Sequence, residues 1–219
     1  MAEQLTKTPE KTSLPVGMLK ACRPKQWPKN VLVFVAPAAA GVITDPYRLK
    51  LTVIGFIAFC MVSSATYLLN DILDVESDRQ HPTKCNRPIA AGVVPIPLGI
   101  AMAVVLFVGG LGVAWLDNPQ ITMVVALYAV LTTSYSLFLK TIPILDLVIL
   151  SAGFILRLLG GAFAAEVDVS DWFLIISLFG SLFIASAKRF AEKKELGDRA
   201  AELRPTLGAY SLEYLGFLR

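Results

Sequence analysis

Charged residues are scarce in this sequence. Of its 219 residues only 17% are charged, whereas 55% are hydrophobic, and the mean hydropathy is +0.64. A water-soluble domain of this size needs far less apolar surface to fill one core. Lipid is therefore expected to be the solvent for most of the surface. The net charge of +3 is small, and no nucleic-acid partner is expected.

Histidine and cysteine are also rare. His81 is the only histidine, and the three cysteines are widely spaced and form neither a CxxC pair nor a cluster with it. This pattern excludes a thiolate metal site. The first 29 residues also lack an apolar stretch followed by a small-residue cleavage site. We therefore expect no cleaved signal peptide, and we expect the first span to direct insertion.

Long apolar runs, by contrast, fill most of the chain. Because about 20 residues are needed to cross ~30 Å of hydrocarbon, runs near this length are candidate spans. They are residues 27–44, 51–69, 96–116, 120–139, 144–165 and 172–187. Lipid offers backbone amides no hydrogen-bond partner, and the runs are too long for barrel strands, so each is predicted to be an α-helix. The predicted fold class is an all-α, polytopic transmembrane helix bundle.

The basic residues predict the orientation of this bundle. If the amino terminus is cytoplasmic, the loop after the second span and residues 188–204 lie inside, and only Arg48 and Lys50 lie outside. The other external turns are neutral or acidic, so the positive-inside rule is satisfied. We therefore expect a multi-pass protein of the cell membrane, with a basic cytoplasmic segment at residues 1–26 and one transmembrane domain at residues 27–219.

Acidic residues gather where the second span ends. Asn70, Asp74 and Asp78 follow at four-residue spacing, so a continuous helix would place them in one stripe with Asp71 at its border. Such carboxylates repel one another unless a cation neutralises them. Hard oxygen ligands suit Mg²⁺, which binds through a few carboxylates plus substrate phosphates. The pattern predicts a magnesium-diphosphate site, and the alternative is a solvated acidic helix end.

A basic loop follows this acidic segment. Lys84 and Arg87 supply positive charge that suits phosphate oxygens beside a metal. Anchoring of the third span explains these two residues equally well. His81 precedes Pro82 and is interpreted as a loop residue instead of a ligand.

The fifth span contains two charged residues. Asp146 and Arg157 are eleven residues apart, close to three helical turns, and therefore share a face. Ionisable residues within a span are functional candidates. Asp146 is a candidate for binding polar substrate atoms, while a structural Arg157 is as reasonable as a functional one.

The segment after the sixth span is rich in charge. Lys188, Glu192 and Glu195 share one helical face, with Arg189 beside it. They form either the second half of the site or a charge-paired helix end at the membrane surface. Three tyrosines are candidates for hydrogen bonds to a substrate or are interfacial aromatics, and these are Tyr67, Tyr135 and Tyr210.

The segment NDILDVESDRQHPTKCNRPIAAG at residues 70–92 resembles the first signature of the UbiA superfamily of intramembrane prenyltransferases. In that signature an NxxxDxxxD helix end binds Mg²⁺ and diphosphate. Three further segments resemble the decaprenyl-phosphate phosphoribosyltransferase branch of the superfamily. They are RPKQWPKN at residues 23–30, YSLFLKTIPILD at 135–146 and AKRFAEKKE at 187–195.

This resemblance implies an enzyme with Mg²⁺ as its cofactor. The implied reaction transfers 5-phosphoribose from phosphoribosyl pyrophosphate to a polyprenyl phosphate such as decaprenyl phosphate, with release of pyrophosphate, for arabinan cell-wall precursor synthesis. Aromatic prenyltransferases of the superfamily usually carry a second DxxxD motif after the sixth helix, where this chain has Lys188, Arg189, Glu192 and Glu195. That departure favours the phosphoribosyl branch. Nine helices are implied, of which this chain would hold about six and would be the amino-terminal portion.

The implied site residues follow from the matched segments. The metal ligands would be Asn70, Asp71, Asp74 and Asp78, and the three carboxylates are the candidate catalytic residues. The candidate substrate-binding residues are Lys25, Asn70, Lys84, Arg87, Tyr135, Lys140, Asp146, Lys188, Arg189 and Glu192.

Two other functions remain open at this point. One is an aromatic prenyltransferase with a polyprenyl diphosphate donor, and the basic segment after the sixth span argues against it. The other is an anion transporter or channel subunit, for which charges near the bilayer midplane are expected instead of charges at one face. The sequence also leaves a homo-oligomer open.

Overall fold

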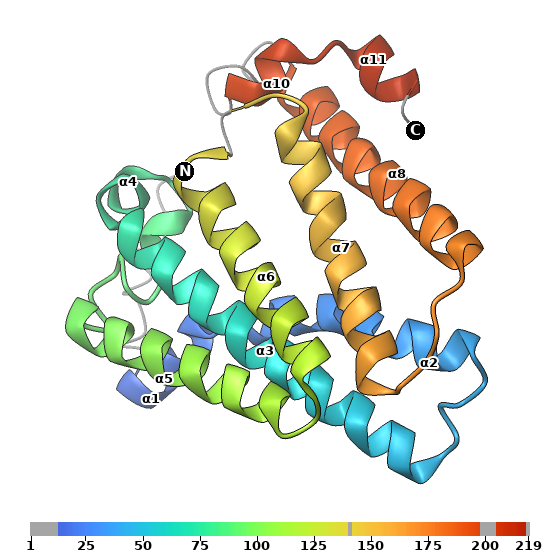
Figure 1. The fold of residues 1–219 in the computed structure, drawn as a ribbon. Coiled ribbons are helices and arrows are strands. Elements are labelled where there is room, and N and C mark those ends of the chain that lie inside the picture. Colours follow the sequence, from blue (N-terminus) through green and yellow to red (C-terminus); the bar gives the residue numbers. More distant parts are fainter. Residues whose placement is uncertain (1–12, 140–141, 198–204, 218–219) are drawn as a thin grey trace, which may run out of the picture.

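The structure, a computed structural model, describes residues 13–139, 142–197 and 205–217, and every regular element in these ranges is a helix (Figure 1). Five helices are long and apolar enough to cross a membrane. They are α3 (Pro46–Leu73), α5 (Ile96–Trp115), α6 (Pro119–Leu137), α7 (Leu145–Ala164) and α8 (Asp171–Leu196). The predicted all-α membrane bundle is confirmed, and the chain is a multi-pass membrane protein.

Short helices connect or flank the long ones. The α-helices among them are α1 (Leu14–Ala21), α2 (Val35–Ala39), α4 (Val75–Gln80), α10 (Pro205–Ala209) and α11 (Leu212–Phe217), and the 3₁₀ helices are η1 (Pro24–Phe34) and η2 (Lys84–Asn86). Figure 1 shows α4 at the upper left and α10 and α11 at the top, all distant from α2 at the lower right. We call the end of the bundle that carries α4, α10 and α11 the charged end.

Local sequence signals set the starts of three long helices. Asp45 accepts hydrogen bonds from the N–H groups of Tyr47 and Arg48 at 2.8 and 3.0 Å, and Asn118 accepts one from Ile121 at 2.9 Å. A proline directly follows each of these two caps, where its missing N–H has no helical partner to lose. Ser170 caps α8 in the same way. These boundaries are therefore encoded within a few residues.

Helices α3 and α7 form the centre of the bundle. In each of them 61% of the apolar segment is buried, against only 11% in α5 and 22% in α8. The apolar surfaces of α5 and α8 are exposed and suit contact with lipid, because lipid tails are as apolar as these side chains. Three charged residues of these two helices, Asp71, Asp146 and Arg157, are buried in the interior of the protein.

The prediction of an α-helical first span is wrong. Residues 24–34 form the 3₁₀ helix η1, and only the five residues of α2 that follow are α-helical. Pro28 lies inside η1, and a proline within an α-helix removes a hydrogen bond and clashes with the preceding turn. A 3₁₀ helix rises ~2.0 Å per residue. Together η1 and α2 therefore extend over about 30 Å, close to the hydrocarbon thickness.

Two consecutive glycines allow η1 and α3 to pack tightly on α7. A Cβ atom at Gly161 would lie 1.7 Å from the carbonyl oxygen of Val33, and one at Gly160 would lie 2.4 Å from the ring of Phe59. No side chain fits at these distances. The backbone of η1 therefore lies directly against α7, and this contact brings its basic residues beside those of α7 and α8.

The predicted continuous stripe after the second span is also interrupted. Helix α3 ends at Leu73 and α4 begins at Val75, with Asp74 between them at φ −91° and ψ 7°. The backbone N–H of Asp74 bonds to the carbonyl oxygen of Asn70 and that of Asp78 to the carbonyl oxygen of Asp74, so helical bonds remain on each side of the bend. As a result, Asp71 and Asp78 both face Arg87.

Candidate functional site

A cavity of about 670 Å³ opens between η1, α3, α6, α7 and α8 near the charged end. Its basic lining residues are Arg23, Lys29, Arg87, Arg157, Lys188 and Arg189, and no Asp or Glu of the described ranges lines it. A concave surface with charge of one sign and low-dielectric walls raises the local concentration of the opposite charge. The cavity is therefore suited to a ligand with several negative charges.

One wall of this cavity is apolar. It consists of Ile149, Leu150 and Phe154 from α7 and Ile184 and Ala185 from α8. Polar aromatic groups lie elsewhere on the lining, from Tyr67, Tyr128 and Tyr135. The combination fits a phosphorylated head group that is attached to an apolar chain.

The 3₁₀ geometry of η1 decides which of its residues reach the cavity. Side chains three residues apart are eclipsed in a 3₁₀ helix, so Arg23, Gln26 and Lys29 form one row, and all three line the cavity. Asn30, from the row that faces α3, is buried, and its amide donates to Ser63 at 3.3 Å. Lys25 belongs to the third row and is exposed. Lys25 therefore does not line the cavity, and its predicted contact with the substrate is not supported by its position.

Two carboxylates and two arginines form the Asp71 cluster: Arg23, Asp71, Asp78 and Arg87. Arg87 Nη1 donates to Asp78 Oδ2 at 2.6 Å and to Asp71 Oδ1 at 3.1 Å, and Arg23 also pairs with Asp71 Oδ1. Both carboxylates are buried, while the arginines line the cavity. The acidic residues therefore hold two arginines in place and offset part of their charge.

Arg157 lies in the middle of α7 and has a different set of partners. Its Nε donates to Asn30 Oδ1 at 2.8 Å, its Nη1 to the carbonyl oxygen of Gly153 at 2.6 Å and its Nη2 to the Tyr128 hydroxyl at 2.8 Å. Within the described part of the chain these partners are all neutral. The charge of this buried arginine, which lines the cavity, is therefore not offset by a carboxylate there.

A second acidic group, the Asp146 cluster, comprises Asp146, Arg189, Glu192 and Tyr210. Arg189 Nε donates to Asp146 Oδ2 at 2.8 Å, and its Nη1 donates to Glu192 at 2.7 Å. The Tyr210 hydroxyl donates to the other oxygen of Asp146. Asp146 is fully buried, whereas Arg189 lines the cavity. Asp146 therefore acts on the cavity through Arg189.

The acidic segment offers oxygen ligands that suit Mg²⁺ but no complete metal cage. Across residues 13–139, 142–197 and 205–217, no three His, Cys, Asp or Glu side chains are grouped closely enough to hold an ion. Mg²⁺ usually binds through one or two carboxylates and completes its shell with water and substrate phosphates. Asn70 lines the cavity, and Asp74 is half-buried at the bend. The donor set fits an ion that arrives with a diphosphate.

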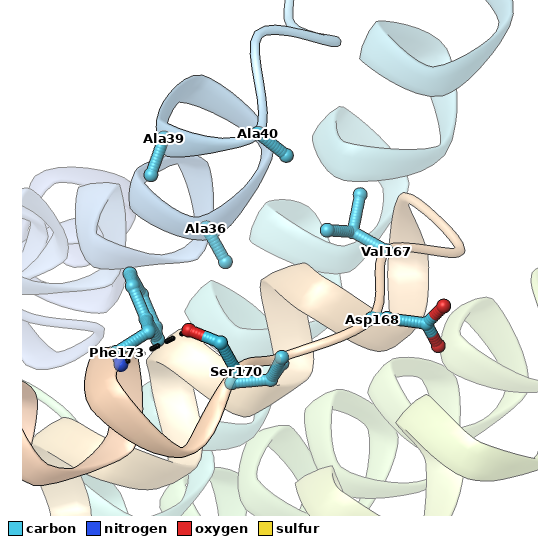
Figure 2. A pocket seen from close by; sticks show the side chains of 8 residues that line it. Ala36, Ala39, Ala40, Val167, Asp168, Ser170 and Phe173 are labelled. Carbon is cyan, nitrogen blue, oxygen red and sulfur yellow. Dashed lines mark hydrogen bonds between the residues drawn. The ribbon is translucent and has the colours of Figure 1, made fainter.

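A second, smaller cavity lies between α2 and the start of α8 (Figure 2). It measures about 220 Å³ and is lined by small or apolar residues together with Asp168 and Ser170. Ser170 caps α8 by accepting the Phe173 N–H at 3.2 Å, as the dashed line shows. Because no basic residue lines it, this cavity does not suit a phosphate group.

The structure brings only some of the predicted residues to the large cavity. Those that line it are Asn70, Arg87, Tyr135, Lys188 and Arg189. Those that do not are Lys25, Asp71, Asp74, Asp78, Lys84, Asp146 and Glu192. Lys84 is exposed on η2, and Lys140 lies outside the described residues.

The sequence interpretation missed several residues of the cavity. Arg23, Gln26 and Lys29 were overlooked because an α-helical period does not group them. The three-residue spacing of these side chains and the nearby prolines Pro24 and Pro28 were the sequence features that could have indicated a 3₁₀ helix. Tyr128 carried no signal, since its role depends on Arg157 from another helix.

Comparison with known proteins gives consistent relationships. Residues 31–209 match the UbiA prenyltransferase family. The decaprenyl-phosphate phosphoribosyltransferase of Corynebacterium glutamicum is 44% identical over 206 residues, which cover 92% of this chain and 62% of that protein. The decaprenyl-phosphate phosphoribosyltransferase of Mycobacterium tuberculosis (strain H37Rv) is 40% identical over 222 residues, 100% of this chain and 73% of that protein. The chain thus spans less than two thirds of the Corynebacterium protein.

A solved structure shares the fold. The UbiA homolog from Archaeoglobus fulgidus bound to DMAPP and Mg²⁺ superimposes with a TM-score of 0.76 at 18% identity, over 92% of this chain and 73% of that one. At this identity the likeness concerns the fold alone. With the family match over most of its length, this chain belongs to the UbiA prenyltransferase family.

Proposed function

We propose that this chain carries the active site of a Mg²⁺-dependent phosphoribosyltransferase. The enzyme transfers 5-phosphoribose from phosphoribosyl pyrophosphate to a polyprenyl phosphate, with decaprenyl phosphate as the preferred acceptor, and releases pyrophosphate. Its product is a lipid precursor for cell-wall arabinan.

The observation that carries this proposal is the cavity with six basic residues and an apolar wall. A donor with a diphosphate and a 5-phosphate, together with an acceptor monophosphate, brings more negative charge than a prenyl diphosphate with a neutral aromatic acceptor. The abundance of cations matches the first pair. The relatives named for this activity, at 40% and 44% identity, support the same choice.

The reaction forms a bond between an acceptor phosphate oxygen and the anomeric carbon of the ribose and breaks the bond from that carbon to pyrophosphate. The acceptor phosphate is already an anion at neutral pH, so the attack needs no strong general base. Arg23 and Arg87 would hold the pyrophosphate and stabilise the charge that it gains, because fixed charges in a preorganised site favour the transition state. Lys29, Arg157 and Lys188 would hold the remaining phosphates at the apolar wall and so orient the two substrates.

Asn70 and Asp74 would hold the metal, while Asp71 and Asp78 would keep Arg23 and Arg87 in position. When bound, Mg²⁺ would supply charge neutralisation and a template for the diphosphate. The distribution of Lys and Arg supports a cytoplasmic position for the charged end, and with it for the active site.

The test is transfer of ribose-labelled phosphoribosyl pyrophosphate to decaprenyl phosphate by the full-length protein in membranes, with and without Mg²⁺. We expect a labelled lipid that requires Mg²⁺ and is lost in Asp74→Ala. Asp168→Ala, which removes a carboxylate from the smaller cavity, is the matched control and should keep full activity.

The absence of a labelled lipid from folded wild-type protein would overturn the proposal. Transfer of a prenyl group to an aromatic acceptor would then indicate the aromatic prenyltransferase reaction. Flux of a labelled anion that is insensitive to Asp74→Ala would indicate a transporter.

A further inference from the structure

Tyr210 lies between α10 and α11, well beyond the last long helix, yet its hydroxyl reaches the start of α7. It accepts a hydrogen bond from the backbone N–H of Ile144 at 2.6 Å and donates one to Asp146. Burial and the bond to Asp146 raise the pKa of Tyr210 above its ordinary value of 10.0, so the hydroxyl keeps its proton at neutral pH. It is therefore a permanent donor to a buried carboxylate.

The residues around Tyr210 hold it firmly against α7 and α8. Leu207, Tyr210 and Leu215 are buried in one cluster with Leu147 of α7 and Ala185 of α8. The ammonium group of Lys193 donates to the carbonyl oxygen of Leu207 at 2.8 Å and also to that of Tyr210. Residues 206–217 thus form a packed clasp across the ends of two helices.

This clasp is connected to the cavity through two hydrogen bonds in series. Tyr210 occupies one oxygen of Asp146, which leaves the other oxygen to accept from Arg189 Nε at 2.8 Å. Arg189 has only 1% of its surface exposed and still lines the cavity. The direction of its guanidinium therefore depends on where Asp146 is held.

Tyr210 also stabilises an unusual backbone conformation at Ile144. Ile144 has φ 69° and ψ −49°, a positive-φ conformation that a β-branched residue keeps only when its surroundings hold it there. The Tyr210 hydroxyl holds it by accepting its N–H. One tyrosine thus fixes both the turn before α7 and the carboxylate at its first turn.

We propose that Tyr210 is a positioning residue for anion binding: through Asp146 it aims Arg189 into the cavity, so that the clasp at residues 206–217 sets the affinity for the phosphorylated donor. This inference rests on the proposed function, because it needs a phosphorylated donor in the cavity. Tyr210 itself does not touch the substrate.

The experiment compares Tyr210→Phe with wild type in the full-length protein, measuring KM for phosphoribosyl pyrophosphate, kcat and the midpoint of thermal unfolding. Loss of one hydrogen bond to a charged group should raise the donor KM by about tenfold. The value of kcat at saturating donor should stay within about twofold, because the same groups act once the donor is bound. Tyr214→Phe is the matched control, since Tyr214 stacks on Tyr210 at 6.1 Å and is 41% exposed.

Two further variants distinguish positioning from general stability. Lys193→Gln loosens the same clasp without altering the Asp146 cluster, and it should raise the donor KM in the same direction. In an Arg189→Lys background, Tyr210→Phe should add little, because residues that act through one another are not additive.

Several results would overturn the inference. They are a donor KM in Tyr210→Phe equal to that of Tyr214→Phe, a fall in kcat and unfolding midpoint with KM unchanged, and full additivity with Arg189→Lys. Failure of the wild type to bind or use the donor would instead overturn the proposed function, so the two failures are distinguishable.

Discussion

The Asp71 cluster and the Asp146 cluster both pair aspartate with arginine beside one cavity, but they differ in access to water. The side chains of Arg23 and Arg87 are 22% and 25% exposed, whereas that of Arg189 is 2% exposed. A partly hydrated ion pair exchanges partners at small cost, while breaking a buried pair leaves a charge without solvent. The first cluster is therefore suited to exchanging its partners for a ligand, and the second to holding Arg189 in a fixed position beside the cavity.

The largest effect is expected when the buried pair is broken. Within the described residues, Asp146→Ala leaves the Arg189 charge with only the more exposed Glu192 as a carboxylate partner. We expect a loss of about 3–5 kcal/mol in the free energy of unfolding. Chemical unfolding of the purified protein in detergent measures it. Asp168→Ala is the control, and an unchanged unfolding free energy for Asp146→Ala would contradict the contrast between the clusters.

A smaller effect, on binding instead of stability, is expected at the Asp71 cluster. Arg87→Lys keeps the charge but loses the fork that bonds Asp71 and Asp78, so the donor KM should rise by at least about tenfold. The unfolding free energy should change by less than ~1 kcal/mol, because the pair is partly exposed. Arg79→Lys is the matched control, since Arg79 pairs with the exposed Glu76. A large loss of stability in Arg87→Lys with an unchanged donor KM would show that the Asp71 cluster is structural and does not bind the ligand.

Arg157 extends the comparison to an arginine with neutral partners. Tyr128→Phe removes one hydrogen bond to this charged group, and it should cost about 1.5 kcal/mol of stability. The donor or acceptor KM should also rise, because Arg157 loses one of the three contacts that direct it into the cavity. Unfolding and steady-state kinetics measure the two effects, with Tyr47→Phe, which is 60% exposed, as the control. An acceptor and donor KM equal to wild type would show that Arg157 is structural only.

The smallest effect concerns Asp117, an acidic residue that lies close to a second acidic residue, Glu166. Burial and the charge of Glu166 raise its pKa from 3.8 to about 6, and its Oδ2 is buried with no hydrogen-bond partner in the described ranges. The folded state then holds the Asp117 proton more tightly than the unfolded state. The contribution of Asp117 to stability is therefore largest below pH 3.8 and is lost as the pH rises through about 6.

Asp117→Asn removes this titration. We expect it to raise the thermal midpoint at pH 7.5 but not at pH 4.5, by no more than a few degrees. A midpoint difference that does not change between these two pH values would rule out Asp117 as the titrating group.

Much of the fold could be predicted from the sequence because length and hydropathy alone determine a transmembrane helix. Helices α5, α6 and α7 begin and end within two residues of the predicted spans, whereas α3 and α8 extend several residues beyond them. The first span could not be predicted in this way. Its backbone lies directly against Gly161, which belongs to a helix more than a hundred residues later.

The site was predictable where neighbouring residues act together. Asp71, Asp78 and Arg87 lie within one short segment, and their grouping was visible in the sequence. The role of Asp71 was not, because Arg23 reaches it from η1. Arg189 bonds to Asp146 from α7, and Arg157 bonds to Asn30 from η1 and to Tyr128 from α6. Only the folded chain reveals these partners.

The most direct measurement of the central claim is the shift in thermal midpoint caused by magnesium pyrophosphate. A ligand at about 100 times its Kd stabilises the folded state by ~2.7 kcal/mol. We predict an upward shift for the full-length wild type and for Arg79→Lys, and little or none for Arg87→Gln at the same concentration. An equal shift in Arg87→Gln would contradict the claim that the arginines of the Asp71 cluster form the diphosphate site.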